Sequence, residues 1–97
     1  MKAYKPKILE KDITAQIRAY LKFKGIFHYK AWQGLGSTKG LPDIVGVLPS
    51  GRALYIEVKT EKGRISDYQE SFLSALQENN ALAFIARSIE DVREKIG

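Results

Sequence analysis

A chain of 97 residues with a net charge of +5 suits one domain with one modest core, and a second domain does not fit. It has no cysteine and a single histidine, which argues against disulfides, thiolate metal sites and histidine-based zinc sites, so any metal must be held by oxygen. No apolar run approaches the ~20 residues that cross a bilayer, and the N-terminus lacks a signal-peptide core, so we expect a cytoplasmic protein with no membrane partner.

The positive charge is concentrated in the first two thirds of the chain. Residues 1–30 carry eight Lys and Arg against two acids, residues 31–66 five against three, and residues 67–97 three against six. Such a surface favours a polyanion such as nucleic acid, with a merely solvated basic surface as the alternative. The few acids within the basic part favour the first interpretation, because carboxylates repel phosphate unless a divalent cation bridges them.

The chain begins with a Lys-rich segment, residues 1–7, which we expect to be an extended basic arm of the single domain 1–97. Apolar residues such as Ile13 and Ile17 then recur at helical spacing and predict a helix over residues 9–24. Glu10 lies on or beside this buried stripe in the first turn. There it either complements the helix dipole or serves as a ligand.

Residues 26–33 are aromatic and predict the first strand. We expect Phe27, Tyr29 and Trp32 to pack in the core rather than to stack on bases, because a small domain needs its aromatic residues for burial. His28 is either a general base or, as we expect, a structural or surface imidazole.

Two strands joined by a hairpin are predicted at residues 44–48 and 54–59. Side chains of a strand alternate between faces, so Glu57 and Lys59 share one face of a strand apolar enough to be central. A carboxylate and an ammonium buried there are costly unless they pair or bind something. An antiparallel pairing would bring Asp43 alongside them, so a hard cation and a phosphate could meet at this point.

Residues 34–40 form a glycine-rich loop that lacks the order of a nucleotide P-loop, and we interpret it as a loop that approaches phosphate. After Lys59 the segment 60–64 is a polar turn that presents further cations. The side chains that we expect to contact DNA are Lys30, Ser37, Lys39, Lys62 and Arg64.

Ser66 and Gln69 open the next helix with the spacing of a capping box, so Gln69 is either a structural cap or a functional residue. The expected apolar face of this helix consists of Tyr68, Phe72, Leu73 and Leu76. A buried strand at 81–86 follows, and a last helix begins at Ser88. The order αβββαβα predicts an α/β fold with a four-stranded mixed sheet flanked by helices.

Pro42-Asp43 followed by Glu57-Val58-Lys59 on the next strand resembles the PD-(D/E)xK nuclease superfamily, whose restriction-endonuclease-like core has the order αβββαβ. The surrounding residues look like the VRR-NUC family in its compact stand-alone form, from about Ile8 to Val92. The segments that carry this likeness are Glu10 to Ile13, Gly40 to Ile44, Gly51-Arg52, Gly63 to Ser66, and Gln69.

The resemblance implies an endonuclease in which Glu10, Asp43, Glu57 and the backbone carbonyl of Val58 hold Mg²⁺ or Mn²⁺. It further implies that Lys59 orients or deprotonates the attacking water, and that the products carry 5′-phosphate and 3′-hydroxyl ends. We place Gln69 with Asp43, Glu57, Lys59 and Glu10 among the expected catalytic residues.

The family also suggests branched DNA as the substrate, in the manner of Holliday junction resolvases that act as homodimers, and a bacterial or phage origin. A two-fold junction cut symmetrically calls for a two-fold dimer. Two alternatives remain at this point. One is a nuclease of the same chemistry acting on flaps, nicks or duplex DNA; the other is a non-catalytic basic DNA-binding module in which Glu57 and Lys59 form only an ion pair.

Overall fold

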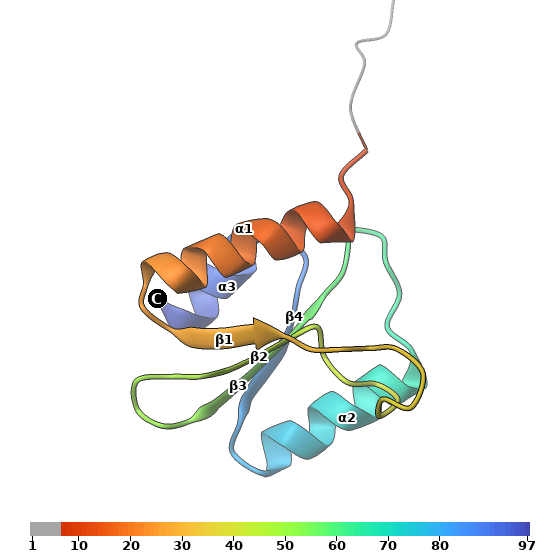
Figure 1. Cartoon of the computed structure of the whole chain (residues 1–97). Coiled ribbons are helices and arrows are strands. Elements are labelled where there is room, and N and C mark those ends of the chain that lie inside the picture. The colour runs from red at the N-terminus through yellow and green to blue at the C-terminus, as the bar shows by residue number, and fades with distance from the viewer. Residues whose placement is uncertain (1–6) are drawn as a thin grey trace, which may run out of the picture.

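The computed structural model describes residues 7–97 and has the predicted order of elements (Figure 1). These are α1 (Glu10–Phe23), β1 (Phe27–Lys30), β2 (Ile44–Val47), β3 (Ala53–Val58), α2 (Asp67–Glu78), β4 (Leu82–Ala86) and α3 (Ile89–Ile96). Apart from Lys7, the predicted basic arm lies outside the described residues. Within residues 7–97, every helix is too short or too polar to span a bilayer.

The four strands form one mixed sheet in the order β1-β2-β3-β4. The first two pairings are antiparallel and the β3–β4 pairing is parallel, with α2 as the crossover. Helices α1 and α3 lie on one face of the sheet and α2 on the other (Figure 1). The predicted fold class is therefore confirmed, and β3, the strand that carries Glu57, is central as its apolar sequence indicated.

The core lies between the sheet and the pair α1 and α3. Ile17 and Leu21 of α1 are fully buried, as are Ile56 of β3 and Val92 of α3. Each such side chain contributes roughly 1.5–3 kcal/mol relative to an exposed position. This packing fixes the N-terminus of α1, where Glu10 lies, and the end of β3, where Glu57 lies, at the same side of the molecule.

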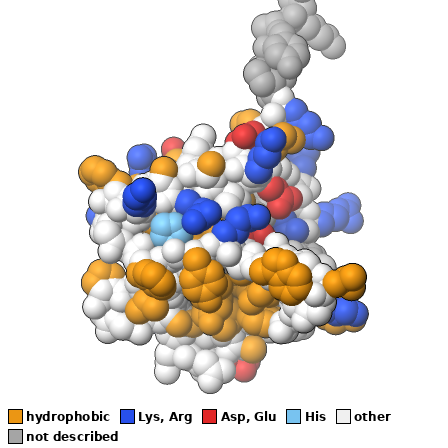
Figure 2. Space-filling view, in the orientation of Figure 1, with side chains coloured by type: hydrophobic (Ala, Val, Ile, Leu, Met, Phe, Trp, Pro, Cys, Tyr) orange, Lys and Arg blue, Asp and Glu red, His pale blue; other side chains and the backbone are white. Residues whose placement is uncertain are grey.

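The expectation that three aromatic residues of the first strand pack in the core is wrong. Phe27 is 70% exposed, Tyr29 50% and Trp32 65%. The physical reason is the cover on the sheet: α2 packs against β4 and leaves the same face bare at β1 and β2. Figure 2 shows the result as a row of apolar side chains along this side of the molecule.

The apolar face expected for α2 is also smaller than predicted. Leu73 is buried, but Phe72 and Leu76 are half-buried and Tyr68 is 59% exposed. Tyr68 lies in the first turn of α2, where its ring has the Lys39 ammonium 4.9 Å from its centroid. The first turn of α2 therefore packs against the glycine-rich loop rather than against the sheet.

Candidate active site

Asp43 and Glu57 are brought together by the antiparallel register of β2 and β3. Ile44 pairs with Ile56, so Asp43, which precedes Ile44, lies opposite Glu57, which follows Ile56. Asp43 Oδ2 accepts a hydrogen bond of 2.7 Å from the backbone N–H of Val58, which fixes the carboxylate at the end of β3. The two carboxylates thus converge from neighbouring strands, as the hairpin predicted.

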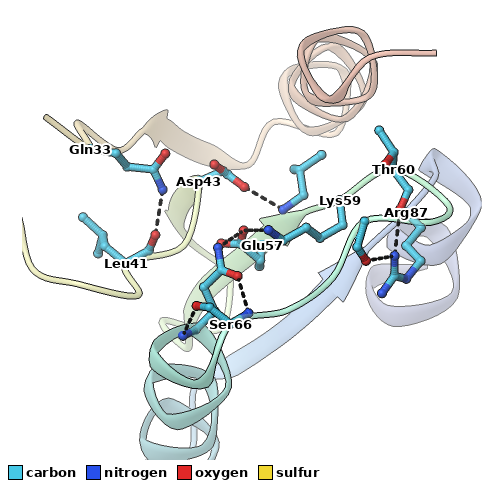
Figure 3. Close-up of polar contacts among 11 residues, drawn as sticks. Gln33, Leu41, Asp43, Glu57, Lys59, Thr60, Ser66 and Arg87 are labelled. Carbon is cyan, nitrogen blue, oxygen red and sulfur yellow. Dashed lines mark hydrogen bonds and ion pairs between the residues drawn. The ribbon is translucent and has the colours of Figure 1, made fainter. Parts of the chain in front are cut away.

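Glu57 is 2% exposed, although it carries a carboxylate. Its Oε2 accepts a hydrogen bond of 3.0 Å from Gln69 Nε2 and lies 3.9 Å from Lys59 Nζ (Figure 3). Its Oε1 is buried and has no hydrogen-bond partner among residues 7–97. A buried oxygen without a partner is costly, so a positively charged ligand that contacted this atom would relieve that cost.

The electrostatics of Glu57 point the same way. Burial, reinforced by the charge of Asp43, raises the pKa of Glu57 from 4.5 to about 8, while the Lys59 ammonium works in the opposite direction. The positive charge of a divalent cation between the two carboxylates would offset both causes of the raised pKa. Carboxylate and carbonyl oxygens are the ligands that Mg²⁺ and Mn²⁺ prefer, so the donor set fits such an ion.

Glu10 occupies a different position from the other two acids. It is the first residue of α1, its side chain is exposed, and it lines a hollow of about 430 Å³ together with Asp43 and Lys30. Its charge contributes weakly to the raised pKa of Glu57. In the part of the chain that the structure describes, no three His, Cys, Asp or Glu side chains form a group that could hold a metal. The structure therefore pairs Asp43 with Glu57 and leaves Glu10 at the rim.

Gln69 acts both as a cap and as a neighbour of the acidic pair. Its Oε1 accepts from the Ser66 N–H at 3.0 Å and Ser66 Oγ accepts from the Gln69 N–H at 3.1 Å, which confirms the predicted capping box. Its Nε2 donates to Glu57. The two interpretations of Gln69 are compatible because they use different atoms of one amide group.

The glycine-rich loop packs on the first turn of α2. Gly40 has a φ of +83°, and a Cβ at this position would overlap the Tyr68 carbonyl, so only glycine permits this approach. Gln33 Nε2 donates to the Leu41 carbonyl at 2.7 Å and holds the end of the loop (Figure 3). Lys39 therefore lies beside the first turn of α2, on the side of the molecule that carries Gln69. Ser37 lines a hollow between the loop and this turn, together with Lys39 and Gln69.

The remaining cations expected at DNA lie on the segment after Lys59. Lys62 and Arg64 are exposed there. Arg87, which sequence reasoning did not single out, holds this segment: its Nη1 donates to the carbonyls of Thr60 at 2.7 Å, Glu61 at 3.2 Å and Gly63 at 2.7 Å. No local pattern predicts this contact, because it joins the end of β4 to a turn 24 to 27 residues earlier.

Comparison with known proteins decides the family. The family model of the VRR-NUC domain matches residues 5–90. The chain belongs to the VRR-NUC family. Among solved structures, a "VRR_NUC domain" has 22% identity and a TM-score of 0.73 over 88% of this chain and 90% of that one. A "VRR_NUC domain protein" has 17% identity and a TM-score of 0.72 over 92% of this chain and 85% of that one.

No curated protein matches this VRR-NUC chain. Membership in the family indicates a nuclease of the PD-(D/E)xK type, in agreement with the motif formed by Asp43, Glu57 and Lys59. The two solved structures share the α/β architecture, and at their level of identity they inform on the fold alone.

We predict that the metal-free protein loses stability as the pH rises from about 4.5 to 8. The folded state retains the Glu57 proton over this window while the unfolded chain has lost it, so the stabilising contribution is complete below pH 4.5 and disappears as the pH passes 8. The loss is at most about 5 kcal/mol, at about 1.4 kcal/mol per pH unit between the two pKa values, and screening by nearby solvent makes it smaller. Urea unfolding in EDTA across this range measures it. Glu57→Gln should lack this component, and equal pH profiles for the two proteins would contradict the assignment.

We predict that millimolar Mn²⁺ raises the melting temperature by several degrees, and by more at pH 8 than at pH 6, because the cation competes with the Glu57 proton. Asp43→Asn should abolish this shift. The matched control is Glu90→Gln, which neutralises an exposed acid of α3 and should respond to Mn²⁺ as the wild type does. A shift that survives Asp43→Asn would place the cation elsewhere.

Proposed function

We propose that this chain is an Mg²⁺- or Mn²⁺-dependent endonuclease that hydrolyses DNA phosphodiester bonds at branched DNA, four-way junctions above all, as a homodimer. The observation that carries the catalytic part is the buried carboxylate of Glu57, with one oxygen unpartnered among the described residues, placed beside Asp43 and Lys59. Family membership supplies the nuclease class.

The metal would be held by Asp43, Glu57 and the backbone carbonyl of Val58, with Glu10 as a further ligand from the rim. When bound, it supplies positive charge that favours the ionised form of the nucleophile and stabilises the charge that develops on the phosphate. Without it, the Asp43–Glu57 pair repels a phosphate.

The other groups of the site have roles that follow from their contacts. Lys59 is 14% exposed at the side chain and is held by Glu57, so its ammonium can orient the attacking water and offset charge on the phosphate. Gln69 fixes the Glu57 carboxylate through Nε2 and is itself fixed by the first turn of α2. Arg87 holds the segment that follows Lys59.

The non-catalytic alternative takes Glu57 and Lys59 as a simple ion pair. The pair exists, but at 3.9 Å it engages only Oε2 and leaves Oε1 buried without a partner in residues 7–97. A purely structural ion pair would have its remaining polar atoms satisfied, since a half-satisfied buried carboxylate destabilises the fold. The arrangement therefore favours a ligand-binding site.

The homodimer is supported by the uncovered face of the sheet. Pairing places Phe27 opposite Val47 and Tyr29 opposite Val45, and these apolar side chains occupy the face that α2 leaves bare. Monomeric proteins rarely expose such a contiguous apolar surface. A second copy would cover it, and a two-fold pair of sites matches a two-fold junction.

The test of this proposal compares end-labelled four-way junction, flap, nicked and linear duplex DNA, each with Mg²⁺, Mn²⁺ or EDTA and with Asp43→Asn as the inactive control. We expect paired, metal-dependent cuts confined to the junction. Cuts in flaps or plain duplex would keep the chemistry and replace the substrate. No metal-dependent cutting of any substrate by folded protein would overturn the proposal. Light scattering with DNA present tests the dimer, which a monomer at micromolar concentration would exclude.

We predict that Lys59→Ala lowers the cleavage rate by at least about 100-fold while folding and DNA affinity stay close to wild type, because the ammonium acts on the reacting groups. Single-turnover cleavage and circular dichroism measure the two effects. Lys95→Ala, which removes an exposed cation of α3, is the control and should cut normally. Wild-type rates for Lys59→Ala would remove this residue from the chemistry.

A further inference from the structure

A groove between α1 and β1 runs away from the acidic pair. It consists of two hollows, of about 670 and 430 Å³, which share Ala15 and Arg18 as lining residues. The smaller hollow ends at Asp43, and the larger continues along α1 to Gly25 at the far end of the helix. The two hollows therefore form one open path that leads out from the candidate active site.

Cations line most of this groove, the acids Glu10 and Asp43 lie at the end nearest the candidate active site, and the side chains of its floor are small. Lys11, Arg18 and Lys22 line it from α1, and Lys30 lines it from β1. On α1 these cations follow the spacing i, i+7 and i+11, which places them on one side of the helix. Between them the floor is formed by short side chains. They are Ala15 and Ala19.

Within residues 7–97, the cations of the groove make no ion pairs and no side-chain hydrogen bonds. Across residues 7–97 the one ion pair joins Lys59 to Glu57, and no side-chain hydrogen bond involves Lys11, Arg18, Lys22 or Lys30. All four side chains are exposed. Figure 2 shows Lys and Arg side chains gathered beside the histidine on this face, above the apolar row.

We propose that the α1–β1 groove binds the sugar-phosphate backbone of the DNA arm on one side of the cleaved bond. The inference rests on DNA being the substrate and adds a binding surface, with Arg18 and Lys22 as its outer contacts. Unpaired cations on both walls, within the described residues, suit a polyanion, and the alanine floor lets a backbone approach closely. Lys39, Lys62 and Arg64 lie on other segments, so they would contact the DNA on other sides of the bond.

The length of the groove suits several phosphates. From Lys11 to Lys22 the helix advances about 16 Å, at 1.5 Å per residue. One strand of duplex DNA carries a phosphate about every 3.4 Å along the helix axis, so four or five phosphates lie within this axial distance, and because the strand winds around the axis only some of them face the groove. Cations one helical turn or more apart can then contact different phosphates. The contacts would be independent of sequence, as structure-specific cleavage requires.

The first test measures the salt dependence of DNA affinity in EDTA, where nothing is cut. The groove variant is Arg18→Gln/Lys22→Gln, and the matched control is Lys24→Gln/Lys95→Gln, which removes the same charge from a different hollow. We expect the negative slope of log K against log salt to become shallower by about 1.8 in the groove variant, because each phosphate that is no longer neutralised reduces its magnitude by about 0.9. The slope of the control should change little.

Equal slopes for the groove variant and the wild type would overturn the proposal, as would equal reductions in groove and control variants. A groove variant with an unchanged slope and an altered mass in light scattering would make the groove an interface between copies, which also overturns it. Because the assay needs no cleavage, a wild type that never cuts but whose slope falls in the groove variant would contradict only the proposed function. If the wild type cuts but the slope is the same with and without the charges of Arg18 and Lys22, only the groove is contradicted.

The second test uses the absence of cysteine from the chain. Ala15→Cys and Ala19→Cys, each labelled with an azidophenacyl group, are photocrosslinked to labelled junction DNA. We expect crosslinks on a single arm, with the Ala19→Cys label attached farther from the branch point than the Ala15→Cys label. Ser74→Cys on the exposed side of α2 is the control and should crosslink weakly. Equal crosslinking from all three positions, or none from the groove, would overturn the proposal.

Discussion

The site depends on a carboxylate that the fold buries in a central strand. Glu57 lies in β3 between β2 and β4, its side chain is almost fully buried, and its neighbours among residues 7–97 satisfy only one of its oxygens. The same burial that raises the pKa of Glu57 would make a divalent cation a favourable partner in the proposed nuclease. Destabilisation of the metal-free state and affinity for the metal are thus one physical effect.

Long-range contacts hold the groups around this carboxylate in place. Gln69 ties Glu57 to the start of α2, and Gly40 lets the glycine-rich loop pack against that same turn. Arg87 ties the end of β4 to the segment after Lys59. Elements far apart in the chain therefore meet at β3, the strand that carries Glu57, which gives the candidate site a rigid frame of the kind that electrostatic catalysis needs.

The edge strand β1 separates two surfaces of opposite chemistry. His28 and Lys30 line the groove beside α1, whereas Tyr29 belongs to the face that α2 leaves bare and Phe27 borders both surfaces. Strand alternation places the two sets on opposite sides of the sheet. One surface suits a polyanion and the other a second copy of the chain, so a dimer and its DNA would occupy largely separate residues.

Local patterns in the sequence were enough to predict the order of the elements, the central position of β3, the capping box at Ser66 and the meeting of Asp43 with Glu57. Each of these follows from periodicity, cap spacing or the register of a short hairpin. The folded arrangement was needed to establish the exposure of Tyr29, the rim position of Glu10, the contact made by Arg87 and the groove beside α1. These features depend on how segments far apart in the chain pack together, for example on which face of the sheet a helix covers. No local pattern in the sequence specifies that packing.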